Sequence, residues 1–385
     1  MKILSIKKSI FKYFALLSFL LSFINTINIH FELKSGEFFN KTSLANQEFF
    51  YIIKTFGISN IKKIFIDIMT YVGDTKIITY FYNINNITVE QYTSKNKNSL
   101  IITILGDSEK LNDMTFSVKS NSNSFYTVLS KFAYTDTDDS LMTNEMKIGH
   151  SYLITLDPKT NDKILSFKNE RIIEKKPIML IFNSLNCIIS LEQLYKYKSD
   201  TLIYLETKKF EQISYDIIDP NNEEYYGRYS ENLEYKIDIL ESNFSENDGN
   251  LCMIYVSAIE GSLNHEETIN DILIANNIPQ QVVFGHNFNH VSYGFVHIDY
   301  KNDLIIKFTL KHKAQYKIIL YYEYEKRGTE EIITSNDILY LKSEEWNNKC
   351  IWDKGCYIQL DITLEKIEDS DNPVLEFSIE MIGTN

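Results

Sequence analysis

Short runs of alternating apolar and polar residues follow one another along most of the chain. Ile64-Phe-Ile-Asp-Ile68 alternates in this way, Gly73-Asp74 is a turn signal, and Lys76-Ile-Ile-Thr-Tyr-Phe-Tyr82 resumes the alternation. This pattern is typical of two strands joined as a hairpin. Polar clusters such as Asp157–Asp162 and Asp219–Glu224 separate further runs at intervals of about 8–12 residues. The sequence therefore predicts an all-β protein made of tandem antiparallel β-sandwich domains.

Helical periodicity is confined to a few short stretches. Apolar residues three and four positions apart occur in Ser190–Lys198 and in Glu266–Asn276. Because this spacing places them on one face of a helix, we expect a short helix in each stretch.

One sequence element occurs near both ends of the chain. Lys76-Ile-Ile-Thr-Tyr-Phe81 matches Lys317-Ile-Ile-Leu-Tyr-Tyr322, and Thr115–Val118 resembles Glu376–Ile379. These matches predict that one sandwich unit is repeated at each end, with a third unit between. Chance similarity between two hairpins of an Ile- and Tyr-rich chain is the alternative. After an N-terminal signal peptide at 1–27, the predicted units are 28–146, 147–261 and 262–385.

The N-terminus has the form of a secretory signal peptide. Met1–Lys12 is basic, and Tyr13–Ile24 is an uncharged apolar run of 12 residues. A membrane-spanning helix needs about 20 apolar residues, so we expect cleavage between Asn25 and Asn28. An uncleaved signal anchor is the alternative. We expect no other transmembrane segment, and the protein is predicted to be secreted or exposed on the cell surface.

The charge excludes one class of partner. The chain has 52 acidic and 39 basic residues, a net charge of −13, and loss of the four signal-peptide lysines takes this to −17 (−13 − 4). Such a chain repels phosphates, so no nucleic-acid partner is expected. The aromatic share of 14% also favours strands.

Four cysteines accompany the signal peptide. An even number in a secreted chain indicates two disulfides, here with three alternative pairings. We favour a short loop between Cys350 and Cys356 and a long-range bond between Cys187 and Cys252. A zinc site is the competing interpretation, but the spacings do not match those of zinc ligands.

Three sequons agree with the secretory route. They place candidate N-glycosylation sites at Asn40, Asn86 and Asn243. Chance sequons are common in a chain so rich in Asn, so each one alone is a weak indication.

Histidines are concentrated in one stretch of the last unit. His286 and His290 share strand parity, and so do His297 and Asp299, but the two pairs have opposite parity. A bulge at Gly294 or a hairpin would bring the four together as a metal site. Surface histidines without a metal are the alternative.

An acidic segment, Thr135–Glu145, is a further candidate for a cation site. An EF-hand beginning at Asp136 is excluded because its sixth position is Leu141 and its twelfth is Lys147. Calcium bound in another geometry and a solvated turn are the two remaining interpretations. No other cofactor is expected.

An aromatic and basic cluster marks a candidate binding surface. Tyr225, Tyr226, Arg228 and Tyr229 lie within five positions. Tyr and Arg are enriched where proteins bind other proteins, and Tyr also stacks on sugars. We therefore predict a protein or glycan ligand, without identifying it.

The first unit resembles a known family of accessory domains. Glu48-Phe-Phe-Tyr-Ile-Ile53, the alternating Ile64–Ile68, Gly73-Asp74-Thr-Lys-Ile-Ile-Thr79 and Phe116-Ser-Val118 are similar to the strands and Gly-Asp corner of bacterial-type pre-peptidase C-terminal (PPC-like) domains. The resemblance covers roughly a third of the chain. It implies a β-sandwich with a non-catalytic, accessory or adhesive role. Several such units without a protease resemble large surface proteins of unicellular eukaryotes.

The common catalytic motifs do not occur in the sequence. G-x-S-x-G, a Walker loop, G-x-G-x-x-G after a strand and H-E-x-x-H are all missing. We therefore expect a non-catalytic, adhesive, structural or ligand-binding protein. The alternatives are a secreted hydrolase or carbohydrate-active enzyme on a β scaffold, with paired carboxylates, and an ectodomain fragment of a larger membrane receptor.

Overall fold

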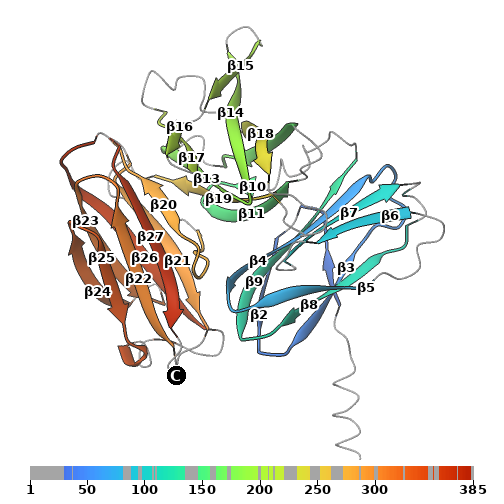
Figure 1. Ribbon diagram of the computed structural model, residues 1–385, viewed down its shortest axis with the longest axis horizontal. Coiled ribbons are helices and arrows are strands. Elements are labelled where there is room, and N and C mark those ends of the chain that lie inside the picture. Colours follow the sequence, from blue (N-terminus) through green and yellow to red (C-terminus); the bar gives the residue numbers. More distant parts are fainter. Residues whose placement is uncertain are drawn as a thin grey trace, which may run out of the picture.

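The described part of the computed structural model consists of β-strands joined by turns and loops, with a short 3-10 helix at Ser343–Glu345 (Figure 1). No α-helix occurs among the described residues, and none of them forms a helix suited to crossing a membrane. The all-β prediction is confirmed. The described residues are 30–36, 38–80, 88–93, 98–105, 108, 111–134, 146–156, 162–170, 175–197, 201–206, 208–210, 213–220, 232–242, 252–261, 272–285, 288–298, 302–323, 326–345, 350, 355–370 and 372–382.

The first unit is a sandwich of two sheets with strand orders β1-β3-β8-β5 and β2-β9-β4-β7-β6. β1 lies parallel to β3, and the other pairs are antiparallel. Apolar side chains from both sheets fill the space between them. The strands are β1 (His30–Leu33), β2 (Phe38–Ser43), β3 (Glu48–Ile53), β4 (Lys63–Val72), β5 (Thr75–Tyr80), β6 (Thr88–Thr93), β7 (Ser99–Leu105), β8 (Met114–Ser120) and β9 (Ser124–Ala133).

The middle unit has the same topology. Its sheets run β10-β12-β18-β14-β15 and β11-β19-β13-β17-β16, so β10–β14 and β16–β19 occupy the places of β1–β5 and β6–β9. β10 is parallel to β12, as β1 is to β3. Its strands are β10 (Met146–Lys147), β11 (His150–Leu156), β12 (Asp162–Lys168), β13 (Ile178–Leu185), β14 (Cys187–Tyr197), β15 (Thr201–Glu206), β16 (Lys208–Phe210), β17 (Ile213–Ile218), β18 (Asn232–Ser242) and β19 (Cys252–Glu260).

The last unit is a sandwich with strand orders β20-β27-β22-β25 and β21-β26-β23-β24. The sequence predicts that this unit repeats the first one. However, the strands that contain the matching sequences pair differently in the two units. β5, which contains Lys76, pairs with β8, whereas β23, which contains Lys317, lies in a different sheet from β27. Its strands are β20 (Gln280–Val283), β21 (His290–His297), β22 (Asp303–Leu310), β23 (Ala314–Tyr322), β24 (Lys326–Ile333), β25 (Asp337–Leu341), β26 (Cys356–Ile367) and β27 (Val374–Ile382).

The turn at Gly73 joins two sheets and does not close the predicted hairpin. β4 and β5 lie in different sheets of the first unit. Gly73 has φ 85°, and a Cβ there would lie 2.2 Å from the carbonyl oxygen of Asn123, so only glycine fits. Asn186, with φ 65°, takes the corresponding place between β13 and β14. A turn is therefore present at Gly73, but it connects strands of two different sheets.

The helix predicted at Ser190–Lys198 is wrong, because this segment forms most of β14. β14 pairs with β18 on one side and β15 on the other. Leu191 and Gln193 are both buried. A polar side chain therefore stands at a position where a strand pattern would have an apolar one, and the alternation cannot be recognised in the sequence. Backbone pairing with two neighbours overrides the local helical pattern. In the other predicted helix, residues 266–271 lie outside the described part, and 272–276 are not helical.

Two disulfides join the four cysteines, in the pairing that the sequence favours. Cys187 on β14 is bonded to Cys252 on β19 across the two sheets of the middle unit. Cys350 is bonded to Cys356 at the start of β26. Each bond has its Cα atoms just over 5 Å apart (5.3 and 5.2 Å), within the normal range.

The two disulfides should stabilise the fold unequally. They close loops with sequence separations of 65 and 6 residues. Loop-closure entropy predicts that Cys187→Ala/Cys252→Ala lowers the free energy of unfolding by about 4 kcal/mol and Cys350→Ala/Cys356→Ala by about 2 kcal/mol. Denaturant unfolding of both variants beside the wild type measures the difference. A larger loss from the second pair would contradict this interpretation.

Candidate functional site

Most residues predicted to bind ligands lie outside the described part of the chain. These are the cluster Tyr225, Tyr226, Arg228 and Tyr229, the acidic segment 135–145, His286 and Asp299, and the sequon residues Asn86 and Asn243. The binding, calcium and glycosylation predictions that depend on them stay predictions.

Asn40 is exposed on β2, an edge strand of the first unit. Its Oδ1 accepts a hydrogen bond of 2.6 Å from the hydroxyl of Thr127, and the sequon residue Thr42 is also exposed. A glycan on Nδ2 would therefore point away from the sandwich. Glycosylation there stays a prediction, and the geometry is compatible with it.

His290 and His297 do not come together. β21 pairs with β26 through eight consecutive residues without a register shift, so there is no bulge at Gly294. The two histidines are seven positions apart along the strand, about 23 Å, and the odd spacing puts them on opposite faces. His297 is buried, with Nε2 3.1 Å from the carbonyl oxygen of Asn302. One ion cannot bind both side chains.

His290 belongs instead to a polar cluster on the outer face of β21 and β26. Its Nε2 lies 3.8 Å from Oδ2 of Asp361. Ser292 Oγ and Gln359 Nε2 donate to Oδ1 of the same carboxylate, at 2.7 and 2.8 Å. Both His290 and Asp361 are largely buried, with side-chain exposures of 18% and 16%. We call these four residues the His290 cluster.

The His290 cluster stabilises the ionised carboxylate of Asp361. Burial alone would raise the pKa of Asp361, but hydrogen bonds from His290, Gln359 and Ser292 outweigh it and hold the pKa below its usual 3.8. A nucleophilic serine would donate its proton to a histidine oriented by an acid. Here the serine hydroxyl donates directly to the acid, so the geometry is not that of a catalytic triad.

Several hydrogen bonds link the three units where they meet. The segment 272–278, which we call the junction strap, runs between the units. Backbone N–H groups of Asn276 and Asn277 donate to the carbonyls of Tyr71 in β4 and Ile379 in β27, at 2.6 and 2.8 Å. The strap thus bonds the first unit to the last.

The junction strap also bonds the middle unit. The hydroxyl of Ser151 in β11 lies 3.2 Å from both the amide nitrogen and the carbonyl oxygen of Leu273. The hydroxyl of Tyr255 in β19 donates to the same carbonyl at 2.7 Å. Leu273 also forms a β-bridge with Gly294 of β21. Seven consecutive residues therefore make contacts with all three units.

Apolar packing is continuous through this junction. The even-numbered residues Ile64, Ile66 and Ile68 of β4 lie in the core of the first unit. The odd-numbered Phe65, Met69 and Tyr71 lie in the core of the last unit, which also takes side chains from β13 and β19 of the middle unit. Both faces of β4 are therefore covered.

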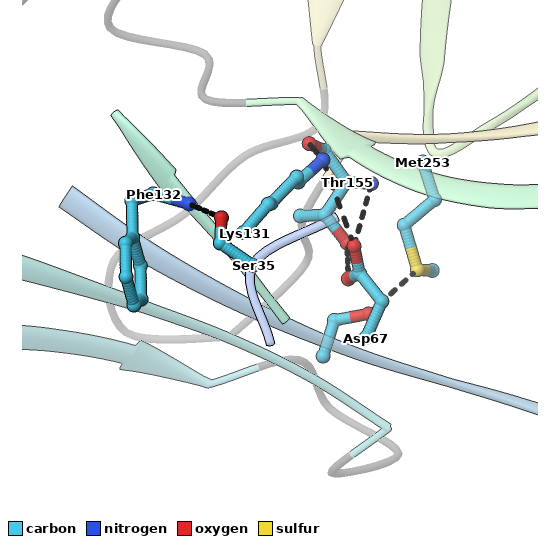
Figure 2. Close-up of polar contacts among 7 residues, drawn as sticks. Ser35, Asp67, Lys131, Phe132, Thr155 and Met253 are labelled. Carbon is cyan, nitrogen blue, oxygen red and sulfur yellow. Dashed lines mark hydrogen bonds and ion pairs between the residues drawn. The ribbon is translucent and has the colours of Figure 1, made fainter. Parts of the chain in front are cut away.

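A buried ion pair lies on this interface (Figure 2). Lys131 Nζ is 3.8 Å from Oδ2 of Asp67, and the two side chains are 6% and 2% exposed. Thr155 of the middle unit donates its hydroxyl and, at 3.3 Å, its backbone N–H to Asp67. Lys131 also lies 3.5 Å from the carbonyl oxygen of Thr155. Close by, Ser99 Oγ donates to the sulfur of Met253 at 3.5 Å.

Sequence reasoning did not predict this junction. The only local indication is Asp67 within the apolar strand Lys63–Val72, which alternation alone assigns to a solvated face. No protein-family model matches the sequence, and no curated protein matches it significantly. The resemblance to PPC-like domains therefore stays a prediction.

Removing one partner of the buried ion pair should destabilise the molecule strongly. Asp67→Ala leaves the charge of Lys131 in the interface without its carboxylate, and we expect the free energy of unfolding to fall by about 3–5 kcal/mol. Asp67→Leu/Lys131→Met, which removes both charges, should lose much less. Lys54→Ala, in the exposed pair with Asp113, is the control and should change little. A double variant as unstable as Asp67→Ala would contradict this account.

The lowered pKa of Asp361 predicts a pH-dependent contribution to stability. A carboxyl group with a depressed folded-state pKa stabilises the fold above its unfolded pKa, and this contribution is lost as the pH falls through the folded value. Asp361→Asn should therefore cost about 1–2 kcal/mol at about pH 7 and progressively less towards about pH 3. Unfolding curves of both proteins across this range measure the difference. A pH-independent difference would exclude ionisation of Asp361 as its source.

Proposed function

We propose that the chain is a secreted or cell-surface, non-catalytic protein that presents binding surfaces on a rigid platform of three sandwiches, in an adhesive, structural or ligand-binding role. The observation that carries the proposal is the junction strap, because one short segment is hydrogen-bonded to all three units. A platform of fixed geometry suits a protein that must hold its surfaces in place.

Both disulfides support the extracellular part of the proposal. No free cysteine is present, and disulfides persist in oxidising compartments. An intracellular protein of this kind would be expected to keep its thiols reduced. The signal peptide predicted at 1–27 agrees with this location.

An aromatic side chain held in solvent supports a binding role. Phe56 is 72% exposed at the tip of the β3–β4 loop. Oδ1 of Asp113 accepts the backbone N–H groups of Thr55 and Phe56, at 3.2 and 3.3 Å, and Thr55 donates its hydroxyl to the carbonyl of Asn112. The turn is fixed although its largest apolar group packs poorly against the protein, which is typical of a contact residue.

The described carboxyl groups with shifted pKa values are all shifted downward. A general acid needs a raised pKa. The hydrogen bond and charge of Lys147 hold the pKa of Glu170 below its usual range, and the hydroxyl of Tyr340 does the same for Asp303. Asp361 is shifted in the same direction.

Mass spectrometry of the protein from its native source tests the location. We expect a mature N-terminus between Asn25 and Asn28, two intact disulfides, and glycan mass on Asn40, with Asn40→Gln as the control that removes it. Intact Met1 together with free thiols and no glycan would refute the proposal and return the search to intracellular functions.

A further inference from the structure

β25 is an edge strand of the last unit, and its only charged residue, Asp337, stands at its first position. It ends the sheet β20-β27-β22-β25, on the side of the unit away from the other two (Figure 1). Its residues Ile338 and Tyr340 are 60% and 47% exposed. Two large apolar side chains at alternate positions of a free edge form a template for pairing with another strand.

The neighbouring edge strand shows how such an edge is normally protected. β24 ends the other sheet of the same sandwich and carries Lys326, Arg327, Glu330 and Glu331. Charged side chains on an edge oppose pairing with another chain. β25 reads Asp-Ile-Leu-Tyr-Leu, with its single charge at the first position.

The exposed face of β25 is fixed in place. Tyr340 lies opposite Ile305, and Ile338 lies opposite Lys307, on β22. The hydroxyl of Tyr340 donates to Asp303, whose other carboxylate oxygen accepts the backbone N–H of Ser343 at 2.7 Å. The Tyr340 ring is therefore held against β22, so pairing would cost it little conformational entropy.

We propose that β25 pairs antiparallel with β25 of a second copy of this chain, about a two-fold axis at Leu339. In this register, Ile338 of each copy faces Tyr340 of the other on the outer face, giving two apolar–aromatic cross-strand pairs. The two four-stranded sheets become one continuous sheet of eight strands. This association does not depend on the location proposed above.

The charges at the two ends of β25 determine the direction of pairing. Asp337 begins the strand, and Lys342 follows its last residue. Antiparallel pairing about Leu339 sets Asp337 opposite Leu341 and Lys342 opposite Asn336 of the other copy, so no two like charges lie opposite each other. Parallel pairing would instead set Asp337 beside Asp337. The local charge pattern thus favours a two-fold dimer, although the chain carries a net charge of −13.

Sedimentation equilibrium and light scattering of the full mature chain test the dimer, at concentrations from about 1 µM to about 300 µM. We expect the wild type to dimerise. Ile338→Lys should raise the dissociation constant about tenfold or more, because each dimer loses two cross-strand pairs. The matched control is Ile332→Lys on β24, where the isoleucine is 58% exposed, and it should dimerise like the wild type. Circular dichroism confirms that both variants fold.

Cysteine cross-linking tests the register. Oxidation of Ile338→Cys/Tyr340→Cys should give a covalent dimer, because residues 338 and 340 of the two copies lie opposite each other, whereas Ile338→Cys alone should not. A wild type that stays monomeric throughout the range would overturn the proposal and leave the edge to a different partner. Equal weakening by Ile332→Lys, or cross-linking by Ile338→Cys alone that is as efficient as by the pair, would also overturn it.

Discussion

The burial of both faces of β4 is the constraint on which the arrangement of the three units depends. An isolated sandwich would expose the face that carries Phe65, Met69 and Tyr71, and here that face packs against the middle and last units. Covering it also buries Asp67, whose charge requires a cation and hydrogen-bond donors, and Lys131 and Thr155 supply them. The junction strap then satisfies backbone groups of the first and last units where they meet. Packing and polar satisfaction therefore fix the units together at the same place.

Much of the strand content could be predicted from the sequence, because period-two alternation follows directly from one buried face. Ile64–Ile68 is an example. The covering of the opposite face could not be predicted, because the residues that cover it are distant in sequence: Thr155 is 88 positions from Asp67, and Met253 is 154 positions from Ser99. The same non-local cause explains the helix wrongly predicted in β14, where pairing on both sides places Gln193 inside.

The candidate site residues show a similar division. Cys350 and Cys356 are only six positions apart, which favoured a disulfide between them. Cys187 and Cys252 were then the pair that remained. Parity along one strand correctly separated His290 from His297, and only an assumed bulge or hairpin could bring them together. Asp361, whose carboxylate lies 3.8 Å from His290, could not have been singled out among 52 acidic residues. Its selection depends on the register between β21 and β26, which is a property of the folded sheet.

Locking the units together leaves the outer strand edges as the parts of the backbone that remain able to pair. Each edge then needs its own protection, since an unpaired row of N–H and C=O groups invites association. β2 carries a sequon at Asn40, where a glycan would block approach, and β24 carries charges. β25 has no sequon and a single charge at its first position, and its exposed Tyr340 is held in place by Asp303. A few charged substitutions in β25 would be enough to prevent pairing with another strand. The exposed and ordered edge is therefore better explained as an interface than as an unprotected edge.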